Sequence, residues 1–406
     1  MLRAYRYRLY PSEDQKVVLA KHFGSCRFVW NYFLDLNNKR YAEERRSTSF
    51  KQMCRELTLL KKEDEYKWLK EVNSQSLQQS LLHLETAYRR FFKKLGEEPV
   101  FKRKHKKKSF IVTQRFNIID NRLFIPNFKG PIRMFRHRDF DGEVRSITIS
   151  QSPSGEYHAS ILVCEQDPDV LQMPVAEESA IGIDMGIRTF ATLSDGTQIH
   201  KPKHIIQSEM KLGKAQKNLS RKRKGSQNRG KQRVKVARLQ EHIANQRKDF
   251  LNKVSDVLTR TYDTIAVEDL SLKEMMKGNH HRAKAVADAG WYTFRMMLKT
   301  KASQRGKNFT EIGRYEPSTR MCSACGHVKS HMRLSERRFV CERCGYTDDR
   351  DVNAAINIRR FALISEGVPT ESGELTPVDR RTTALELLAR EGIRASALVE
   401  AGSPRV

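Results

Sequence analysis

The chain has 406 residues, of which 76 are Lys or Arg and 48 are Asp or Glu, and its formal net charge is +28. No apolar run approaches the roughly 18 residues of a membrane-spanning helix. Residues 1–10 carry three Arg without the apolar core of a secretory signal, so we expect a cytoplasmic protein. Seven Cys, an odd number, argue against a disulfide framework. A net charge this large favours a polyanionic partner, and nucleic acid is the expected one.

The positive charge is concentrated in two segments. Residues 89–108 contain ten basic and two acidic residues, and residues 201–260 contain 18 basic and four acidic ones. From residue 362 onward the balance reverses to five Arg and seven acids, and Gly, Pro, Ser and Thr are frequent. We therefore predict that residues 363–406 form a disordered tail outside the fold, apart from a short helix at 383–390.

The N-terminal part of the chain is predicted to hold a strand and then a helical domain. Residues 5–9 alternate Tyr or Leu with Arg, which is typical of a strand with one basic face. Pro11 and Ser12 then begin a helical region in which apolar residues recur at helical spacing, with a break expected at Gly24. Residues 11–96 are therefore predicted to be a helical domain.

Residues 97–168 are predicted to be antiparallel β structure. Short alternating stretches, such as 146–149 and 158–163, are separated by turn signals such as Asp141-Gly142. We expect a small barrel, to which residues 1–10 add a strand, so that the helical block becomes an insertion. A linker is expected at 167–178.

Strands and helices alternate after this linker, which indicates an α/β domain over 176–314 and 351–362. Its predicted elements are a buried strand at 180–184, a hairpin around 194–197, a helical hairpin over 201–260 broken at 225–230, strands at 264–267 and 309–312, and helices at 291–303 and 351–362.

Four cysteines have the spacing of a structural zinc site, C-x₂-C-x₁₅-C-x₂-C. They are Cys322, Cys325, Cys341 and Cys344. Each pair is followed by Gly, which permits the tight turn that lets two thiolates face one ion. Four thiolates leave no open position for chemistry, so we predict one structural Zn²⁺ in a ribbon over residues 315–350. A redox pair is the alternative.

Three acids occupy positions that suit a metal-dependent nuclease. Asp184 and Glu268 each end a predicted buried strand, and Asp351 opens the last predicted helix. Convergent carboxylates are the ligands that Mg²⁺ prefers. Two such ions can hold the attacking and leaving oxygens of a phosphodiester. Taken singly, each acid also fits an ordinary structural role: a turn residue for Asp184, an ion pair for Glu268 and a helix cap for Asp351.

The combination of these motifs resembles the TnpB family, transposon-encoded RNA-guided DNA endonucleases related to type V CRISPR effectors. The resemblance covers about residues 1–362. The residues that carry it are Gly182-Ile183-Asp184-Met185-Gly186, Val267-Glu268-Asp269-Leu270, Gly290-Trp291-Tyr292-Thr293-Phe294, the four cysteines, Asp349-Arg350-Asp351, Asn353-Ala354-Ala355, Leu84-Glu85-Thr86-Ala87-Tyr88 and Phe91-Phe92.

The resemblance implies a fold that is α/β and α+β, with several domains. A RuvC-like, RNase H-type nuclease domain would contain an inserted zinc ribbon that binds target nucleic acid, and an N-terminal wedge β-barrel would be interrupted by a helical recognition domain. It also implies a guide RNA derived from the transposon end and a short flanking motif on the target DNA. The family's catalytic positions are filled here by Asp184, Glu268 and Asp351.

Candidate nucleic-acid contacts fall into two groups. By likeness to the family, the readers of the flanking motif lie near the second recognition helix and in the barrel, and the polar residues there are Ser74, Gln75, Gln78, Thr113 and Gln114. Ordinary solvated positions are the alternative. Basic residues that would contact phosphates are Lys102, Arg103, Lys104, Lys106, Lys107, Arg221, Lys222, Arg223 and Lys224.

These observations predict an RNA-guided endonuclease that cleaves double-stranded DNA with Mg²⁺, with no membrane or small-molecule partner. Its cofactors would be two Mg²⁺ ions, one structural Zn²⁺ and a guide RNA. One alternative is an RNA-guided DNA-binding repressor without nuclease activity, and the complete acid triad argues against it. The other is a protein-only DNA-binding transposase accessory, which would act without RNA.

Overall fold

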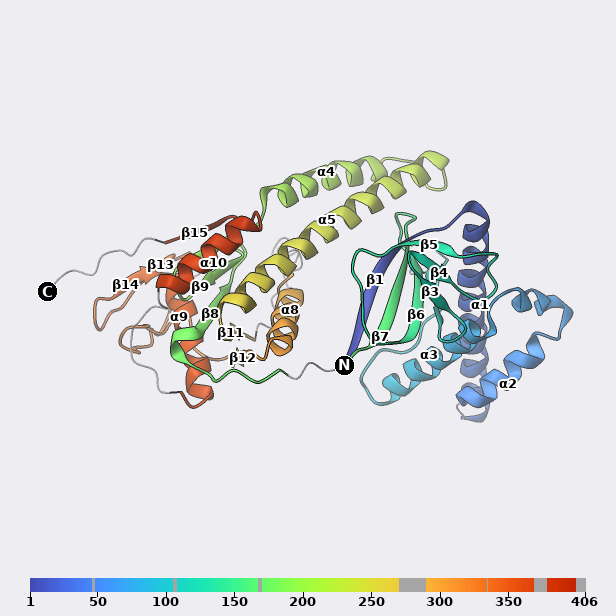
Figure 1. Ribbon diagram of the computed structural model, residues 1–406, viewed down its shortest axis with the longest axis horizontal. Helices are drawn as coiled ribbons and strands as arrows, with labels where there is room; N and C mark the ends of the chain where they lie inside the picture. The colour runs from blue at the N-terminus through green and yellow to red at the C-terminus, as the bar shows by residue number, and fades with distance from the viewer. Residues whose placement is uncertain are drawn as a thin grey trace. The chain divides into compact units, whose positions relative to one another are not determined.

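The computed structural model describes residues 1–45, 48–104, 108–166, 170–269, 290–333, 335–368 and 378–398. The chain forms two compact units: Met1–Asp167 with Lys222–Arg238, and Pro168–Arg221 with Leu239–Val406 (Figure 1). Within the described ranges, no helix combines the length and apolarity that crossing a bilayer requires.

The first unit contains a seven-stranded antiparallel sheet in the order β2-β6-β7-β1-β5-β4-β3. The first strand pairs with β7 on one side and β5 on the other, so the predicted addition of residues 1–10 to this sheet is confirmed. The order ends at β2 and β3, and no pairing joins these two strands within the described ranges. Ladder pairing therefore does not close the sheet over these ranges, and the predicted small barrel stays a prediction. The strands are β1 (Leu2–Tyr10), β2 (Lys108–Val112), β3 (Asn117–Ile119), β4 (Arg122–Phe124), β5 (Ile132–Phe135), β6 (Glu143–Gln151) and β7 (Tyr157–Cys164).

Helices inserted between β1 and β2 share a core with this sheet. The first begins at a capping box formed by Ser12 and Gln15. It then runs unbroken past Gly24, where a Cβ would meet nothing within 4 Å, so the predicted break is wrong. The rings of Phe23 and Phe110 lie 5.4 Å apart and join helix to strand in one apolar cluster. The helices are α1 (Glu13–Glu44), α2 (Phe50–Leu60), the 3₁₀ helix η1 (Asp64–Glu71) and α3 (Ser74–Phe92).

The second unit contains a six-stranded sheet in the order β12-β11-β8-β9-β10-β15. Three neighbouring strands, β12, β11 and β8, are parallel, and β9, β10 and β15 are antiparallel to their neighbours. The predicted strands and hairpin are present. Their bounds are β8 (Ala180–Met185), β9 (Ala191–Leu193), β10 (Thr197–Ile199), β11 (Thr264–Glu268), β12 (Asn308–Ile312) and β15 (Ala395–Ala397).

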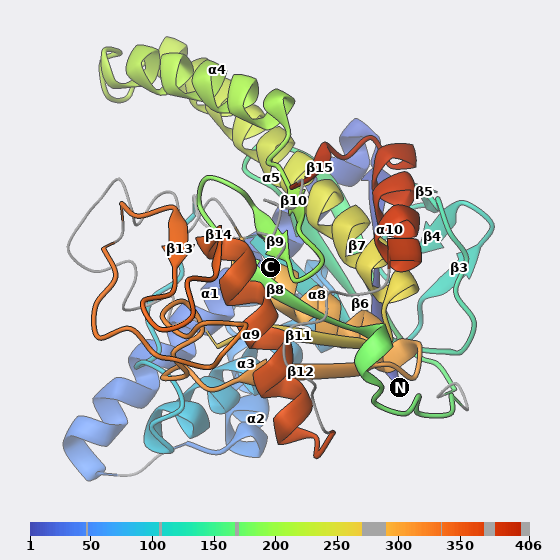
Figure 2. The same cartoon turned by 90° about the vertical axis from the view of Figure 1, so that its left-hand side faces the viewer.

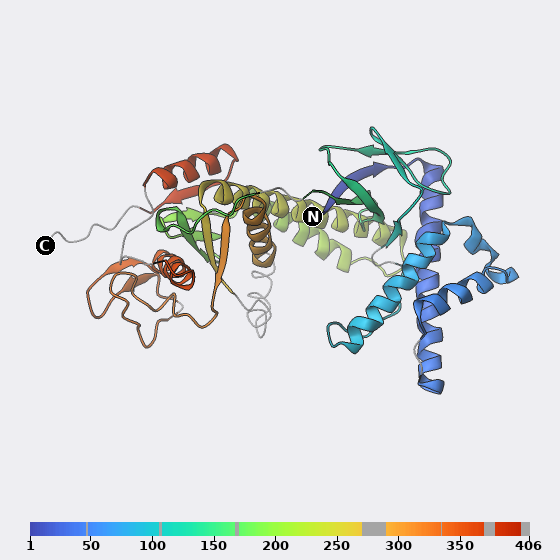
Figure 3. The same cartoon turned by 60° about the horizontal axis from the view of Figure 1, so that its bottom comes forward.

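Helices cover both faces of the second sheet. Alternate residues of β8 and β11, such as Ile183 and Val267, pack with α5, α8 and α10. Ala266 directly precedes Val267 in β11, so its side chain points to the other face of the sheet, where it packs with Ile358 of α9. Accordingly, α9 and α10 lie on opposite sides of the sheet (Figure 3). The bounds are η2 (Glu177–Ser179), α4 (Lys203–Ser220), α5 (Gln227–Thr261), α8 (Trp291–Gln304), α9 (Arg350–Ser365) and α10 (Val378–Arg390), so the α4–α5 turn at 221–226 begins before the predicted break.

The C-terminal segment is part of the fold, and the predicted tail over 363–406 is wrong for most of its described residues. Leu363 is buried in α9, and β15 pairs with β10 at the edge of the sheet. Ala384 and Leu388 of α10 are fully buried in the apolar core. Leu387 and Ile393 join the same core, so the predicted short helix is seated by an apolar face within a segment that is polar on average. Residues 369–377 and 399–406 lie outside the described residues.

Candidate active site

The site lies where α9 crosses the parallel strands (Figure 2). At Gly182 in β8, an added Cβ would collide with the backbone carbonyl of Ala355 and lie 2.6 Å from the amide nitrogen of Arg359. Only a residue without a side chain allows this approach. Asp184 lies two residues along the strand, on the same face as Gly182. Asp351 lies about one turn before Ala355 on the helix. The close crossing therefore brings both acids to the same end of the contact.

Glu268 joins them through strand register. The parallel pairing of β11 with β8 sets Val267 opposite Ile183, so Glu268 continues this register beside Asp184. Both acids lie at the carboxyl ends of their strands, on the face that α9 covers. Asp351 and Glu268 therefore lie near enough to Asp184 to raise its pKa, although Glu268 is 84 positions beyond Asp184 and Asp351 is 83 positions beyond Glu268.

The electrostatics of the site reflect this convergence. Burial, followed by repulsion from Asp351 and Glu268, raises the pKa of Asp184 to about 7. Burial also raises the pKa of Glu268. Partly buried carboxylates that repel one another are destabilised unless a cation neutralises them. The donor set, with three converging carboxylates and no sulfur, suits a hard divalent cation such as Mg²⁺.

Arginine side chains partly neutralise the acids. The Arg350 guanidinium donates to Asp351 Oδ1 through Nε at 3.1 Å and Nη2 at 3.0 Å, and its charge opposes the upward shift of the Asp184 pKa. Arg337 Nη1 lies 3.9 Å from Asp351 Oδ2. Sequence reasoning missed both arginines. The adjacency of Arg350 to Asp351 was a usable signal for one, but nothing marked Arg337.

The acids beside the triad have structural partners. Asp349 caps α9, since its Oδ1 accepts from the backbone N–H groups of Asp351 at 2.9 Å and Val352 at 3.3 Å. Asp269 pairs with Arg295 at 2.7 Å and Arg314 at 3.2 Å, and hydrogen bonding to Arg295 lowers its pKa. Because these pairs satisfy Asp269, its charge has less need of a metal than that of Glu268 next to it.

The four predicted cysteines form one cluster. All four sulfur atoms lie within 4.8 Å of one another. The Sγ atoms of Cys322 and Cys344 are 3.8 Å apart, and those of Cys325 and Cys341 are 3.6 Å apart. A tetrahedron with Zn–S bonds of about 2.3 Å has S···S edges of about 3.8 Å, so the cluster fits zinc. The small sheet of β13 (Arg338–Val340) and β14 (Thr347–Asp349) completes the ribbon.

Two buried amides attach this ribbon to α9. Asn353 Nδ2 donates to Met321 O at 2.8 Å, and its Oδ1 accepts from Ser323 N at 2.9 Å. Asn357 Nδ2 donates to Met321 O at 2.7 Å and to Ser318 O at 2.8 Å. The i, i+4 spacing places both amides on one side of the helix that carries Asp351. Placement of Asp351 is therefore coupled to the fold of the ribbon.

The candidate base readers gather where α3 begins and β2 ends. Gln75 Nε2 donates to Gln114 Oε1 at 2.7 Å, and Ser74 Oγ accepts from Lys61 Nζ at 2.9 Å. The side chain of Gln78 is exposed one turn along α3, and Thr113 directly follows β2. The structure thus brings together candidates that lie about 40 residues apart in the sequence.

The basic candidates differ in their surroundings. Lys102 is fixed on α1: its ammonium lies 3.7 Å from the Trp30 ring centroid, and its backbone N and O bond to Asn31. Arg103 and Lys104 are exposed, and Lys106 and Lys107 lie outside the described residues. The remaining candidates form the turn between α4 and α5, where most are exposed: Arg221, Lys222, Arg223 and Lys224.

Three family models match the chain. They are described as "Probable transposase" over residues 160–279, "Cas12f1-like, TNB domain" over 291–358 and "Helix-turn-helix domain" over 1–46. The second range contains the four cysteines and most of α9. In the third range the structure has β1 and the single long helix α1.

Relatives align over nearly the whole chain. One from Streptomyces pristinaespiralis, named "Putative RNA-guided DNA endonuclease", is 38% identical over 365 residues, which cover 89% of each chain. Another from Escherichia coli, "Putative RNA-guided DNA endonuclease InsQ", is 34% identical over 391 residues and covers 92% of this chain and 96% of its own. A solved structure titled "Structure of the mini-RNA-guided endonuclease CRISPR-Cas_phi3" covers 92% of this chain and 94% of its own, with 9% identity and a TM-score of 0.46, a likeness too weak to bear on function.

Proposed function

Since the chain belongs to the TnpB family, we propose that it is an RNA-guided endonuclease that cleaves double-stranded DNA by Mg²⁺-dependent phosphodiester hydrolysis. A transposon-end-derived RNA would select the target by base pairing, and the protein would read a short flanking motif. The names of the relatives support the RNA-guided endonuclease class. The protein would act in the cytoplasm, on nucleoid DNA.

The observation that carries the proposal is the convergence of Asp184, Glu268 and Asp351 on one face of the sheet. In the proposed reaction these three side chains would hold two Mg²⁺ ions. Bound Mg²⁺ supplies an activated water and charge near the leaving oxygen. The protein's part is to keep the carboxylates fixed. Strand register supports a place for Glu268 beside Asp184, and the close crossing of α9 over Gly182 supports a place for Asp351 near Asp184.

Arg350 has a distinct role in this proposal. Without metal, its guanidinium satisfies Asp351 and lessens the repulsion on Asp184. If Asp351 held metal, the same guanidinium would be available to a phosphate of the cleaved strand, which suits its planar donor geometry. Arg350→Lys would then keep the charge yet lower the cleavage rate.

The four cysteines would hold one structural Zn²⁺, as the match to the "Cas12f1-like, TNB domain" model also favours. All four ligand positions are then protein thiolates, so zinc folds the ribbon and leaves the reaction to the acids. Basic residues of 102–104 and of the α4–α5 turn would hold phosphates of RNA and heteroduplex.

The test is cleavage by the purified ribonucleoprotein. Protein co-expressed with its RNA, given matched linear DNA and Mg²⁺, should cut, and Asp184→Ala should bind the DNA without cutting it. Tight guided binding without cleavage by the wild type would favour the repressor. Undiminished activity after removal of RNA would favour the protein-only transposase accessory.

A further inference from the structure

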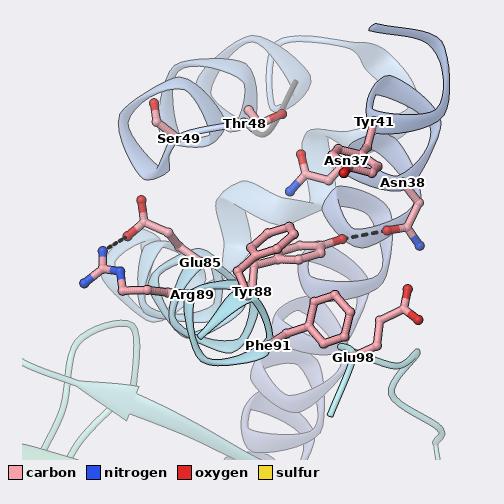
Figure 4. Close-up of a pocket in the computed structure, with 11 residues that line it drawn as sticks. Asn37, Asn38, Tyr41, Thr48, Ser49, Glu85, Tyr88, Arg89, Phe91 and Glu98 are labelled. Atoms are coloured by element: carbon pink, nitrogen blue, oxygen red, sulfur yellow. Dashed lines mark hydrogen bonds and ion pairs between the residues drawn. The ribbon is translucent and has the colours of Figure 1, made fainter. Parts of the chain in front are cut away.

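A cavity in the helical part of the first unit is separate from both the acid cluster and the base-reader candidates. It has a volume of about 600 Å³ and lies between α1, the start of α2 and α3 (Figure 4). This volume is within the range of small-molecule sites. The lining residues come from four stretches of chain and include Asn37, Tyr41, Tyr88, Phe92 and Glu98.

Aromatic rings form much of its wall. The rings of Tyr88 and Phe92 are nearly parallel, with centroids 6.3 Å apart and an interplanar angle of 19°. The Tyr41 ring lies 6.5 Å from that of Phe92. Phe92 is 55% exposed and Tyr41 44%, so part of each ring faces solvent. In a protein with a net charge of +28, exposed aromatic faces offer stacking platforms for nucleobases.

The wall also carries polar groups of both kinds, and one acceptor among them has no partner. Asn37 is only 7% exposed, and its Oδ1 has no hydrogen-bond partner among the described residues. Asn38 Oδ1 already accepts from the Tyr88 hydroxyl at 2.7 Å, and Glu85 is satisfied by Arg89 and the backbone of Phe50. A buried acceptor without a donor carries a free-energy penalty that a ligand N–H would remove. The carboxylate of Glu98 adds a second acceptor at the rim.

We propose that this cavity binds one unpaired nucleobase of the guide RNA, stacked on the aromatic wall and donating an exocyclic amine to Asn37. The proposal rests on the proposed function, since it needs a bound RNA. RNA is favoured over DNA because proteins recognise RNA mostly through unpaired, splayed-out bases. Adenine, cytosine and guanine carry the exocyclic amine that this contact requires, whereas uracil does not.

The test is chemical probing of the RNA in the ribonucleoprotein, with dimethyl sulfate for A and C and kethoxal for G. We expect an unpaired A, C or G that is protected in the wild-type complex and becomes reactive in Phe92→Ala and in Asn37→Leu. Phe92→Ala should also speed RNA dissociation roughly tenfold, the loss typical of one stacked base. Both variants should fold, because Phe92 is exposed and Asn37→Leu removes an unpaired acceptor.

The control is Phe135→Ala in β5 of the same unit, where the ring is 59% exposed and outside the cavity; its RNA should match that of the wild type. Unchanged reactivity in both cavity variants would overturn the proposal while leaving the endonuclease assignment intact. A uridine as the only affected base would overturn the amine contact. If the variants changed base reactivity only in added target DNA and not in the RNA, the assignment of the cavity to RNA would be overturned. Absence of any co-purifying RNA would overturn both proposals.

Discussion

The backbone of Ala355 in α9 occupies the space where a side chain on Gly182 in β8 would stand. Two residues along the strand is Asp184, and about one turn back along the helix is Asp351. The distance between the Asp184 and Asp351 carboxylates, which are proposed to share metal, therefore depends on the contact between Gly182 and Ala355. Glycine at position 182, two residues before the acid at the strand end, permits this geometry because it has no side chain.

Gly182→Ala should displace α9 and abolish cleavage, because the added Cβ meets backbone atoms that cannot rotate away. Stability should fall by about 1–3 kcal/mol, as for overpacked cores. Cleavage of matched DNA and thermal unfolding measure the two effects. The control is Gly213→Ala in α4, where a Cβ meets nothing within 4 Å; there stability should rise slightly, because Ala favours helix. Full cleavage by Gly182→Ala would refute the role of the contact.

Asp184→Asn should stabilise the metal-free protein while abolishing cleavage. Since the folded state raises the pKa of Asp184 to about 7, the stability from this group is present below the unfolded value near 4 and lost as pH rises through about 7. The gain from Asn should therefore be on the order of 4 kcal/mol at pH 8 and less than half of that at pH 5. Thermal unfolding at both pH values measures it.

Magnesium provides the complementary measurement for this variant. Added Mg²⁺ should raise the unfolding temperature of the wild type and have little effect on Asp184→Asn. Asp269→Asn is the matched control, since Asp269 is already paired with Arg295 and Arg314. It should lose up to about 1 kcal/mol and keep its response to Mg²⁺. Equal Mg²⁺ responses in wild type and Asp184→Asn would contradict the metal assignment.

The sequence was most informative where chemistry and periodicity coincide. Strand-end acids such as Asp184 and Glu268 follow short buried runs, and the cysteine spacing has few other uses, so these positions can be identified from the order of residues alone. The two acids are neighbours only because β11 pairs with β8, and the helices α4 and α5 lie between these strands in the sequence. One sequence carries no register information at that distance.

The sequence was least informative where a contact depends on tertiary context. The sequence predicts a short helix at 383–390, but that its residues Ala384 and Leu388 are buried in the core depends on the sheet against which α10 packs. The same holds for Asn353, whose amide could equally have faced water. Burial against the ribbon, which determines its role, is a property of the assembled fold.

Asn353→Leu should uncouple the ribbon from the helix that carries Asp351. The change leaves Met321 O with Asn357 as its remaining amide partner and removes the acceptor for the Ser323 N–H. Stability should fall by about 1–3 kcal/mol, and cleavage should fall more than RNA binding. Zinc content, measured by atomic absorption, should stay near one per chain, because no cysteine is altered. Cys54→Ser, a thiol outside the cluster, should change none of these readouts.

Acidification should weaken the first unit through His22. Burial lowers the pKa of this ring, its Nδ1 lies 2.9 Å from Val18 O, and its Nε2 accepts from the backbone N–H of Asn73, the cap of α3. The contribution of His22 is therefore present above the unfolded value of about 6.5 and is lost as pH falls toward the lowered folded value.

The measurement is the unfolding free energy of the wild type and of His22→Phe between pH 7.5 and 5.5. We expect the wild type to lose stability across this range and the variant to lose less of it, although it begins lower because Asn73 N–H loses its acceptor. His331→Gln, at an exposed position, should keep the wild-type slope. A variant slope equal to that of the wild type would show that another group titrates.

Base readers and phosphate contacts should separate in their response to salt and to DNA sequence. Gln75 and Gln114 are joined by a hydrogen bond at the start of α3, so either can present an amide edge to a base. Gln75→Ala should change which flanking motifs support cleavage, with a cost of roughly 1–3 kcal/mol at the recognised base and little change in salt dependence. Lys104→Ala should instead weaken binding to all sequences and lower the salt slope by about 1. Cleavage of a library of randomised flanking sequences at two salt concentrations distinguishes the two effects. A Gln75→Ala variant with unchanged motif preference would remove this cluster from the reading of DNA.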